Sequence, residues 1–170
     1  MKYSLVLLLF LYSFINLFAQ NTNQEFGLFL GAKYIQNIDQ VKPSVGLNYE
    51  YKFLSTKPSL GIGAIADVTM NKKLEMTGGI ALYIHPTDNL RFFIAPGVYY
   101  VNYGVAPNDP NIPYLILKEK WGSQIRILVQ AGAQYDFQLK DAIYLSPFIK
   151  FEKLENDFRF FLGVGASYKI

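Results

Sequence analysis

Few ionisable residues in this chain are spaced in a way that is typical of catalysis. The absence of cysteine excludes a disulfide framework, a thiolate metal site and a cysteine nucleophile. The single histidine, His85, precedes a proline turn, and the strands predicted below place no serine at its level on a neighbouring strand. Because a Ser–His pair requires hydrogen-bond contact, we interpret His85 as a packed or solvated rim residue. Metal-ligand clusters, a P-loop and a dinucleotide fingerprint are also absent, so we expect no catalytic residue, cofactor or metal.

The remaining charges are better suited to structure than to chemistry. A net charge of +3 is too small to indicate nucleic-acid binding. We predict a structural ion-pair network in a confined interior, where lone charges are costly and the two signs must balance. Its predicted members are Lys33, Glu50, Asp67, Glu75, Arg126, Lys150, Glu152 and Arg159. Glu50 is expected near mid-depth, with a partner that stays open, and the other seven members are expected in one half of the interior. The charges expected in the other half are Glu25, Lys52, Arg91, Asp136 and Lys169. A gated path for ions or protons is the alternative reading.

The elements that position these charges are strands, because apolar residues recur with a period of two. In the stretch Asp157–Ile170 one face is wholly apolar, whereas the other carries Arg159 and Lys169. Successive side chains of a strand point to opposite sides, so this alternation indicates one apolar and one polar face. The same pattern recurs over residues 25–35, 45–53, 60–70, 74–85, 90–101, 124–137 and 143–152. Most of these eight stretches reach the roughly 9–11 residues that a membrane-spanning strand needs.

The uncharged face of every predicted strand favours lipid over water as its surroundings. Only 17% of the residues are charged, and several of these lie in connections. The sequence therefore predicts an all-β protein, a single antiparallel up-and-down transmembrane β-barrel of about eight strands. Glycines opposite Phe29, Phe148 and Phe161 predict a filled waist, which means that side chains fill the interior at mid-height. Pro96 and Pro147 predict a bulge or a missing hydrogen bond within their strands. A secreted lipocalin-like carrier is the alternative with a similar fold.

The first 20 residues have the layout of a cleaved signal peptide. Lys2 provides a positive start, an apolar stretch follows, and Ala19 offers a small residue before cleavage. We therefore expect residues 1–20 to be a signal peptide and residues 21–170 to form the barrel domain.

Taken together, the residues Phe18-Ala19-Gln20, the alternating strands and the ending Tyr168-Lys169-Ile170 resemble the small outer-membrane β-barrel proteins of Gram-negative bacteria, in a Bacteroidota-like form. The resemblance implies export to the cell outer membrane, with outer-membrane lipid and lipopolysaccharide around the barrel. It also implies that periplasmic chaperones and the barrel assembly machinery handle the chain, with Tyr168 and Ile170 as the C-terminal assembly signal.

The resemblance further implies that both termini lie in the periplasm. Residues 55–58, 86–89 and 138–141 then become periplasmic turns, and residues 36–42, 71–72, 104–120 and 153–156 become outer loops. We expect a non-enzymatic protein with a structural, adhesive or partner-interaction role, in which loop 104–120 is a possible extracellular partner site. The alternatives are a narrow channel for ions or small solutes and a lipid A-modifying enzyme.

Overall fold

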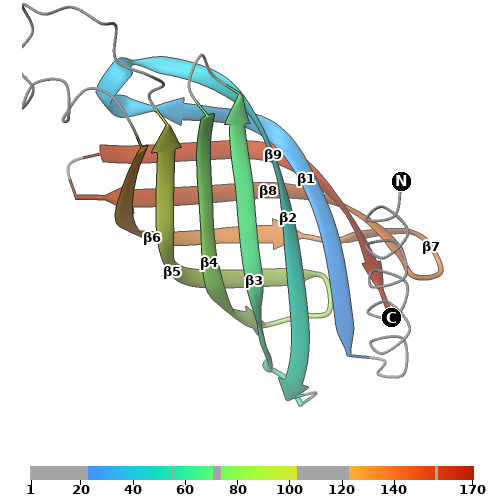
Figure 1. Ribbon diagram of the computed structural model, residues 1–170. Helices are drawn as coiled ribbons and strands as arrows, with labels where there is room; N and C mark the ends of the chain where they lie inside the picture. Colours follow the sequence, from blue (N-terminus) through green and yellow to red (C-terminus); the bar gives the residue numbers. More distant parts are fainter. Residues whose placement is uncertain (1–22, 55, 71–73, 103–122, 156) are drawn as a thin grey trace, which may run out of the picture.

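The computed structural model describes residues 23–54, 56–70, 74–102, 123–155 and 157–170, which form a closed antiparallel barrel (Figure 1). Its strands are β1 Gln24–Ile35, β2 Gln40–Leu54, β3 Ser59–Met70, β4 Leu74–His85, β5 Leu90–Asn102, β6 Ser123–Tyr135, β7 Phe137–Lys140, β8 Ile143–Leu154 and β9 Asp157–Lys169. A 3-10 turn, η1 (Gln36–Ile38), joins β1 to β2. Among the described residues, no helix has the length and apolar character needed to cross a membrane.

Eight long strands close the ring, as the sequence predicted. Neighbours along the chain pair from β1 to β6, β9 pairs with β8, and the contacts β1–β9 and β6–β8 complete the circle. At the seam Phe26 lies opposite Tyr168, and the backbone N–H of Ile170 donates to the carbonyl of Gln24 at 2.8 Å. The predicted pairing of the last strand with the first is therefore confirmed. We call the end with the β2–β3, β4–β5 and β7–β8 connections the turn end, and the opposite end the loop end.

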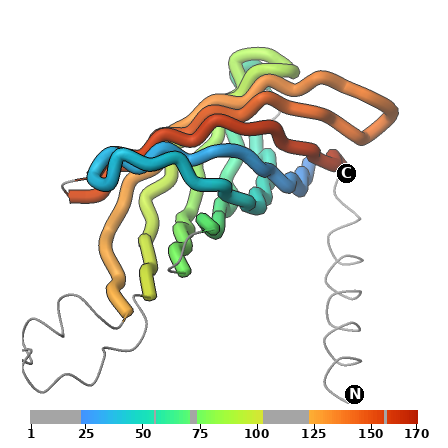
Figure 2. Tube along the Cα trace, turned by 90° about the horizontal axis from the view of Figure 1, so that it is seen from above, coloured from blue at the N-terminus to red at the C-terminus, as the bar shows by residue number. Residues whose placement is uncertain are grey.

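Pro147 explains why a ninth, short strand is present. The β6–β8 ladder stops at Gln134–Phe148 and resumes in the same register as β7–β8 at Phe137–Leu145, so β6 and β7 are one strand interrupted opposite the proline. Proline has no N–H to donate to a ladder. Pro147 itself keeps its Cα partner on β9, so β8 is unbroken. Figures 1 and 2 show that the β7–β8 hairpin projects beyond the ring.

Pro96 has a similar local effect on β5. The β4–β5 ladder lacks partners between Gly79–Gly97 and Leu82–Ile94, and the register is the same on both sides of this gap. The β5–β6 ladder continues through Pro96. The prediction for the two prolines is thus confirmed in the form of missing pairs, without a bulge and without loss of either strand.

Three predicted connections differ from the structure. The connection expected over residues 36–42 is only η1 and Asp39, because β2 begins at Gln40 and pairs with β1 from there. Asp39 adopts the left-handed conformation that Asp tolerates (φ 48°) and accepts a hydrogen bond from the Tyr34 hydroxyl at 3.0 Å. The turn expected over residues 138–141 is wrong, since β7 reaches Lys140 by pairing with β8.

In the third difference, β8 runs on through Lys153 to Leu154, because both residues pair with β9. Lys153 thereby lies on the outward face, where its ammonium sits 3.9 Å from the centre of the Phe158 ring. Predictions for residues 1–20, 71–72 and 104–120 lie outside the described residues.

The two faces of the barrel separate by residue parity as predicted. Outward side chains are apolar and exposed, such as Leu30 (61% exposed), Ile80 (65%) and Leu162 (58%). Most inward side chains are buried, and they include most of the charged residues of the strands. This inverted distribution is typical of a transmembrane barrel, in which lipid surrounds the apolar face.

Candidate functional site: the filled barrel interior

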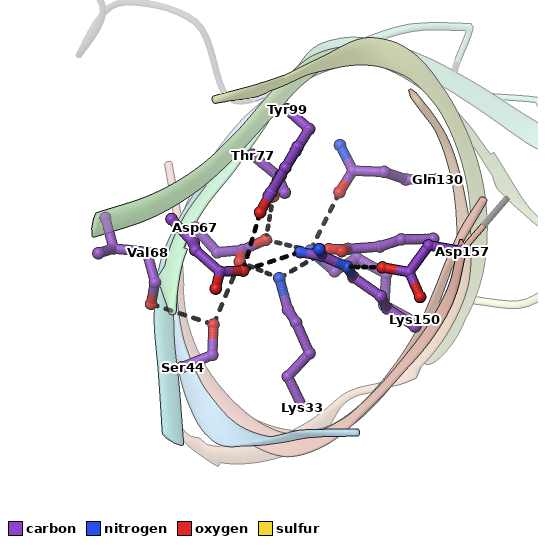
Figure 3. Close-up of polar contacts among 12 residues, drawn as sticks. Lys33, Ser44, Asp67, Val68, Thr77, Tyr99, Gln130, Lys150 and Asp157 are labelled. Atoms are coloured by element: carbon purple, nitrogen blue, oxygen red, sulfur yellow. Dashed lines mark hydrogen bonds and ion pairs between the residues drawn. The ribbon is translucent and has the colours of Figure 1, made fainter. Parts of the chain in front are cut away.

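A cluster of two lysines and two carboxylates occupies the loop half of the interior, and Figure 3 shows three of its members, Lys33, Asp67 and Lys150. Lys33 and Lys150 both pair with Asp67, one with each carboxylate oxygen. Their ammonium groups also lie 2.9 Å and 2.7 Å, respectively, from the same oxygen of Glu152. All four side chains are fully buried and their formal charges cancel. The four residues come from β1, β3 and β8, so the cluster ties together strands that are distant in the ring.

Neutral side chains make further hydrogen bonds to Asp67 and Lys150 of this four-residue cluster. The hydroxyls of Ser44 and Thr77 donate to Asp67 at 3.1 Å and 2.5 Å, and the Lys150 ammonium donates to the Gln130 side-chain oxygen at 3.0 Å. Asp67 therefore receives four donors, as many as an ionised carboxylate can accept. Such complete pairing is what makes a buried charge tolerable.

A second cluster lies toward the mouth of the loop end. Arg159 donates to Glu75 at 3.1 Å and to Asp157 at 2.8 Å, and its guanidinium lies 4.3 Å from the centre of the Tyr99 ring. The Tyr99 hydroxyl also donates to Glu75 at 3.0 Å. Asp157 accepts a backbone hydrogen bond from Asn37 at 3.3 Å, which connects the cluster to the β1–β2 turn.

Arg126, predicted to join the network, does not join these clusters in the structure. Its side chain is exposed and donates to Gln124, two residues away on the same strand, at 2.7 Å. The cause is the staggered rim, because β8 pairs with β6 only from Val129 onward and leaves the first part of β6 standing beyond it. An inward-facing side chain is therefore buried only where its strand pairs with a neighbouring strand on each side.

Arg91 organises a third cluster in the turn half. Its guanidinium contacts Glu25, lies 3.0 Å from Glu50 and lies 3.6 Å from Asp136. Lys169 extends the cluster with an ammonium 2.8 Å from Asp136. The sequence left the partner of Glu50 open, although the inward parity of Arg91 was the available signal.

His85 supplies the other partner of Glu50, with Nε2 2.5 Å from its carboxylate. The side chain is buried (2% exposed) rather than solvated at a rim. The expectation that no serine lies at its level is wrong, because β3 begins one residue earlier than predicted and places Ser59 directly opposite His85. No hydrogen bond joins Ser59 to His85 among the described residues, and no group of three or more metal-ligating side chains occurs in that part of the chain.

An aromatic layer separates the charges of the loop half from those of the turn half. The rings of Phe29 and Phe148 stack with centroids 4.6 Å apart, and Phe93 stacks on the other side of Phe148 at 5.8 Å. Phe161 meets both Phe29 and Phe148 edge-on at about 5.5 Å. All four rings are buried, so the filled waist predicted from the sequence is present.

Glycines opposite the aromatic layer make room for its rings. A Cβ atom on Gly46 would lie 2.3 Å from the Phe29 ring, and one on Gly132 would lie 2.4 Å from the Phe93 ring. Both distances are far below van der Waals contact, so these strand positions require glycine for the layer to form.

No protein-family model matches this chain, and no curated protein matches it. Solved structures do match its fold. Ail of Yersinia pestis has a TM-score of 0.51 at 10% identity, with 87% of this chain and 99% of that chain covered, and another structure of Ail holds the heparin analogue sucrose octasulfate. The N-terminal β-barrel domain of Pseudomonas aeruginosa OprF gives 0.51 at 11% identity, with 85% and 97% covered. The de novo designed TMB2.3 gives 0.52 at 15% identity, with 89% and 98% covered. The chain thus has the fold of the small transmembrane β-barrels that include outer-membrane proteins.

Proposed function

We propose that this barrel resides in the cell outer membrane and has a structural, adhesive or partner-interaction role without catalysis. The observation that carries the proposal is the filled interior: three charge clusters and an aromatic layer occupy the space in which a substrate or a solute would have to sit. An eight-stranded barrel is just wide enough for side chains to fill it. We therefore assign the structural, adhesive or partner-interaction role to the outer surface of the barrel and to its connections.

For export, we propose that residues 1–20 act as a cleaved signal peptide. We further propose that the barrel assembly machinery recognises Tyr168 and Ile170. The turn end then faces the periplasm and the loop end faces outward. Ail with its bound heparin analogue supports extracellular ligand binding as a role that barrels of this fold can carry. On this chain, loop 104–120 is the proposed site for such a partner.

Two other functions have less support. A channel would need a continuous path, whereas the Phe29–Phe148–Phe93 stack crosses the waist. A lipid A-modifying enzyme would need a free Ser–His pair, whereas Nε2 of His85 is engaged by Glu50.

Cell fractionation combined with gel migration tests the proposal. We expect the protein in the outer-membrane fraction, with a folded band that shifts only after boiling, and we expect no steady current in planar bilayers. Recovery of the protein without detergent in the soluble fraction would refute the membrane assignment. A steady ion-selective current would instead favour the channel.

A further inference from the structure

An open apolar groove crosses the outward face of β9, β1, β2 and β3 in the turn half of the barrel and reaches Ile143 at the start of β8. Its volume is about 650 Å³, which falls within the range of small-molecule sites. Among the described residues that line it, none is charged. The three charge clusters of the interior lie on the other side of the sheet and do not contribute to it.

The groove arises from the register of two neighbouring cross-strand ladders. The ladder nearer the turn end consists of Ile143, Tyr168, Phe26, Tyr49 and Ala64. The next ladder consists of Ala166, Leu28, Leu47 and Ala66. The alanines leave the backbone of β9 and β3 uncovered, while the larger residues form the walls. Because neighbouring strands lie about 4.8 Å apart, the four strands from β9 to β3 span about 14 Å, and Ile143 on β8 extends the groove by about one further strand spacing.

Phe26, Tyr49 and Tyr168 form an aromatic wall on the side of the groove toward the turn end, and contacts fix part of this wall. The rings of Phe26 and Tyr49 are 4.8 Å apart, and the Tyr49 hydroxyl donates to the side chain of Gln24 at 3.4 Å. These contacts orient the wall before any ligand arrives. A tyrosine hydroxyl on the side toward the turn end also suits a membrane interface, where one end of the residue is apolar and the other is wet.

We infer that this groove binds an acyl chain of a glycerophospholipid from the leaflet at the turn end. The inference rests on the proposed membrane location, since the groove is continuous with the apolar outward face that would contact hydrocarbon. All five strands that line the groove are paired on both sides, so they offer no free edge to a peptide. A peptide backbone lying there in hydrocarbon would have unsatisfied N–H and C=O groups, whereas an acyl chain has no such groups.

Native mass spectrometry of the detergent-purified protein tests the inference, with dimyristoyl phosphatidylethanolamine as the probe. We expect the wild-type protein to retain one lipid per chain. The double variant Ala64→Leu/Ala66→Leu fills one end of the groove and should bind at least tenfold more weakly. A matched control, Ala32→Leu/Ala131→Leu, enlarges two outward alanines elsewhere on the barrel and should bind like the wild type.

A second variant, Ala166→Leu, fills the groove at β9 and keeps the test usable if the double variant does not fold. Equal lipid binding by the wild-type and filled-groove proteins would overturn the inference, and so would the absence of a bound lipid in the wild type. A two-chain mass that disappears on filling the groove would overturn it in favour of a second copy as the occupant.

The proposed membrane location is tested separately with the same protein samples. Membrane fractionation and the heat-dependent band shift report whether the barrel forms and where it resides. A folded barrel in the outer membrane that binds no lipid would refute acyl-chain binding by the groove but not the membrane location. A soluble barrel sinks the membrane assignment, whatever its lipid content.

Discussion

Replacing Lys150 by methionine tests whether the buried charges stabilise the barrel as a paired network. The substitution keeps the apolar length of the side chain but removes the ammonium that contacts Asp67, Glu152 and Gln130. Lys33 then remains as the single cation for the two carboxylates, which leaves one uncompensated negative charge in a fully buried cluster. Breaking a buried pair by removing one partner typically costs about 3–5 kcal/mol, so we expect a loss of this size in the free energy of unfolding.

The double variant Lys150→Met/Glu152→Gln separates the charge effect from loss of packing. It restores neutrality, because Lys33 and Asp67 remain as a balanced pair. We therefore expect its destabilisation to be smaller than the sum of the two single effects by about 1–3 kcal/mol. The two single variants Lys150→Met and Glu152→Gln and the double variant are compared by urea unfolding in lipid vesicles. The measured quantity is the fraction of protein that still shows the heat-dependent band shift.

Arg126→Met is the matched control, since the structure leaves that side chain exposed. We expect its stability to lie within about 0.5 kcal/mol of the wild type. The reasoning is refuted if Lys150→Met is equally harmless, because the interior would then be hydrated enough to screen its charges. It is also refuted if the double variant loses as much as the sum of the single variants.

Three further measurements test other parts of the structure. First, replacing both Phe29 and Phe148 by alanine removes the central stack of the aromatic layer. Single-channel recording in planar bilayers should then detect a current that the wild type lacks. A double variant that folds but carries no current would contradict the aromatic layer as the main barrier. Second, the exposed Lys57 ammonium lies 2.6 Å from Asp88 in a turn and lowers the pKa of that carboxyl from 3.8, through a hydrogen bond and Coulomb attraction. The contribution of this pair to stability is therefore present above pH 3.8 and lost as the pH falls through the lowered pKa, and carboxyl NMR should show the Asp88 midpoint rising toward 3.8 in Lys57→Met, whereas an unchanged midpoint would exclude the pair in solution. Third, His85→Ala should leave the mass spectrum of lipid A unchanged in expressing cells, and a mass change that depends on His85 would point to the enzyme.

Much of the fold was determined by local sequence. The alternation of side chains along a strand is a property of the backbone, so the residues of Leu74–His85 could be assigned to faces without knowledge of their neighbours. The bounds of that strand and the effects of Pro96 and Pro147 followed from the same local signals, whereas the pairing of the last strand with the first followed from closure of the predicted barrel. The inward parity of Lys33, Asp67 and Lys150 likewise identified them as interior charges before their contacts were known.

Tertiary structure decided which inward residues meet, because closure of the ring brings together side chains that are far apart in sequence. Glu50 contacts His85 and Arg91, which are 35 and 41 residues away, and no local pattern specifies those distances. The opposition of Ser59 to His85 depended on a strand starting one residue earlier. Arg126 has the parity of a buried residue, yet it is exposed because the rim is staggered where β6 extends beyond β8. The period of two thus set the face of each side chain, whereas the register between strands set its partners, its depth and its exposure.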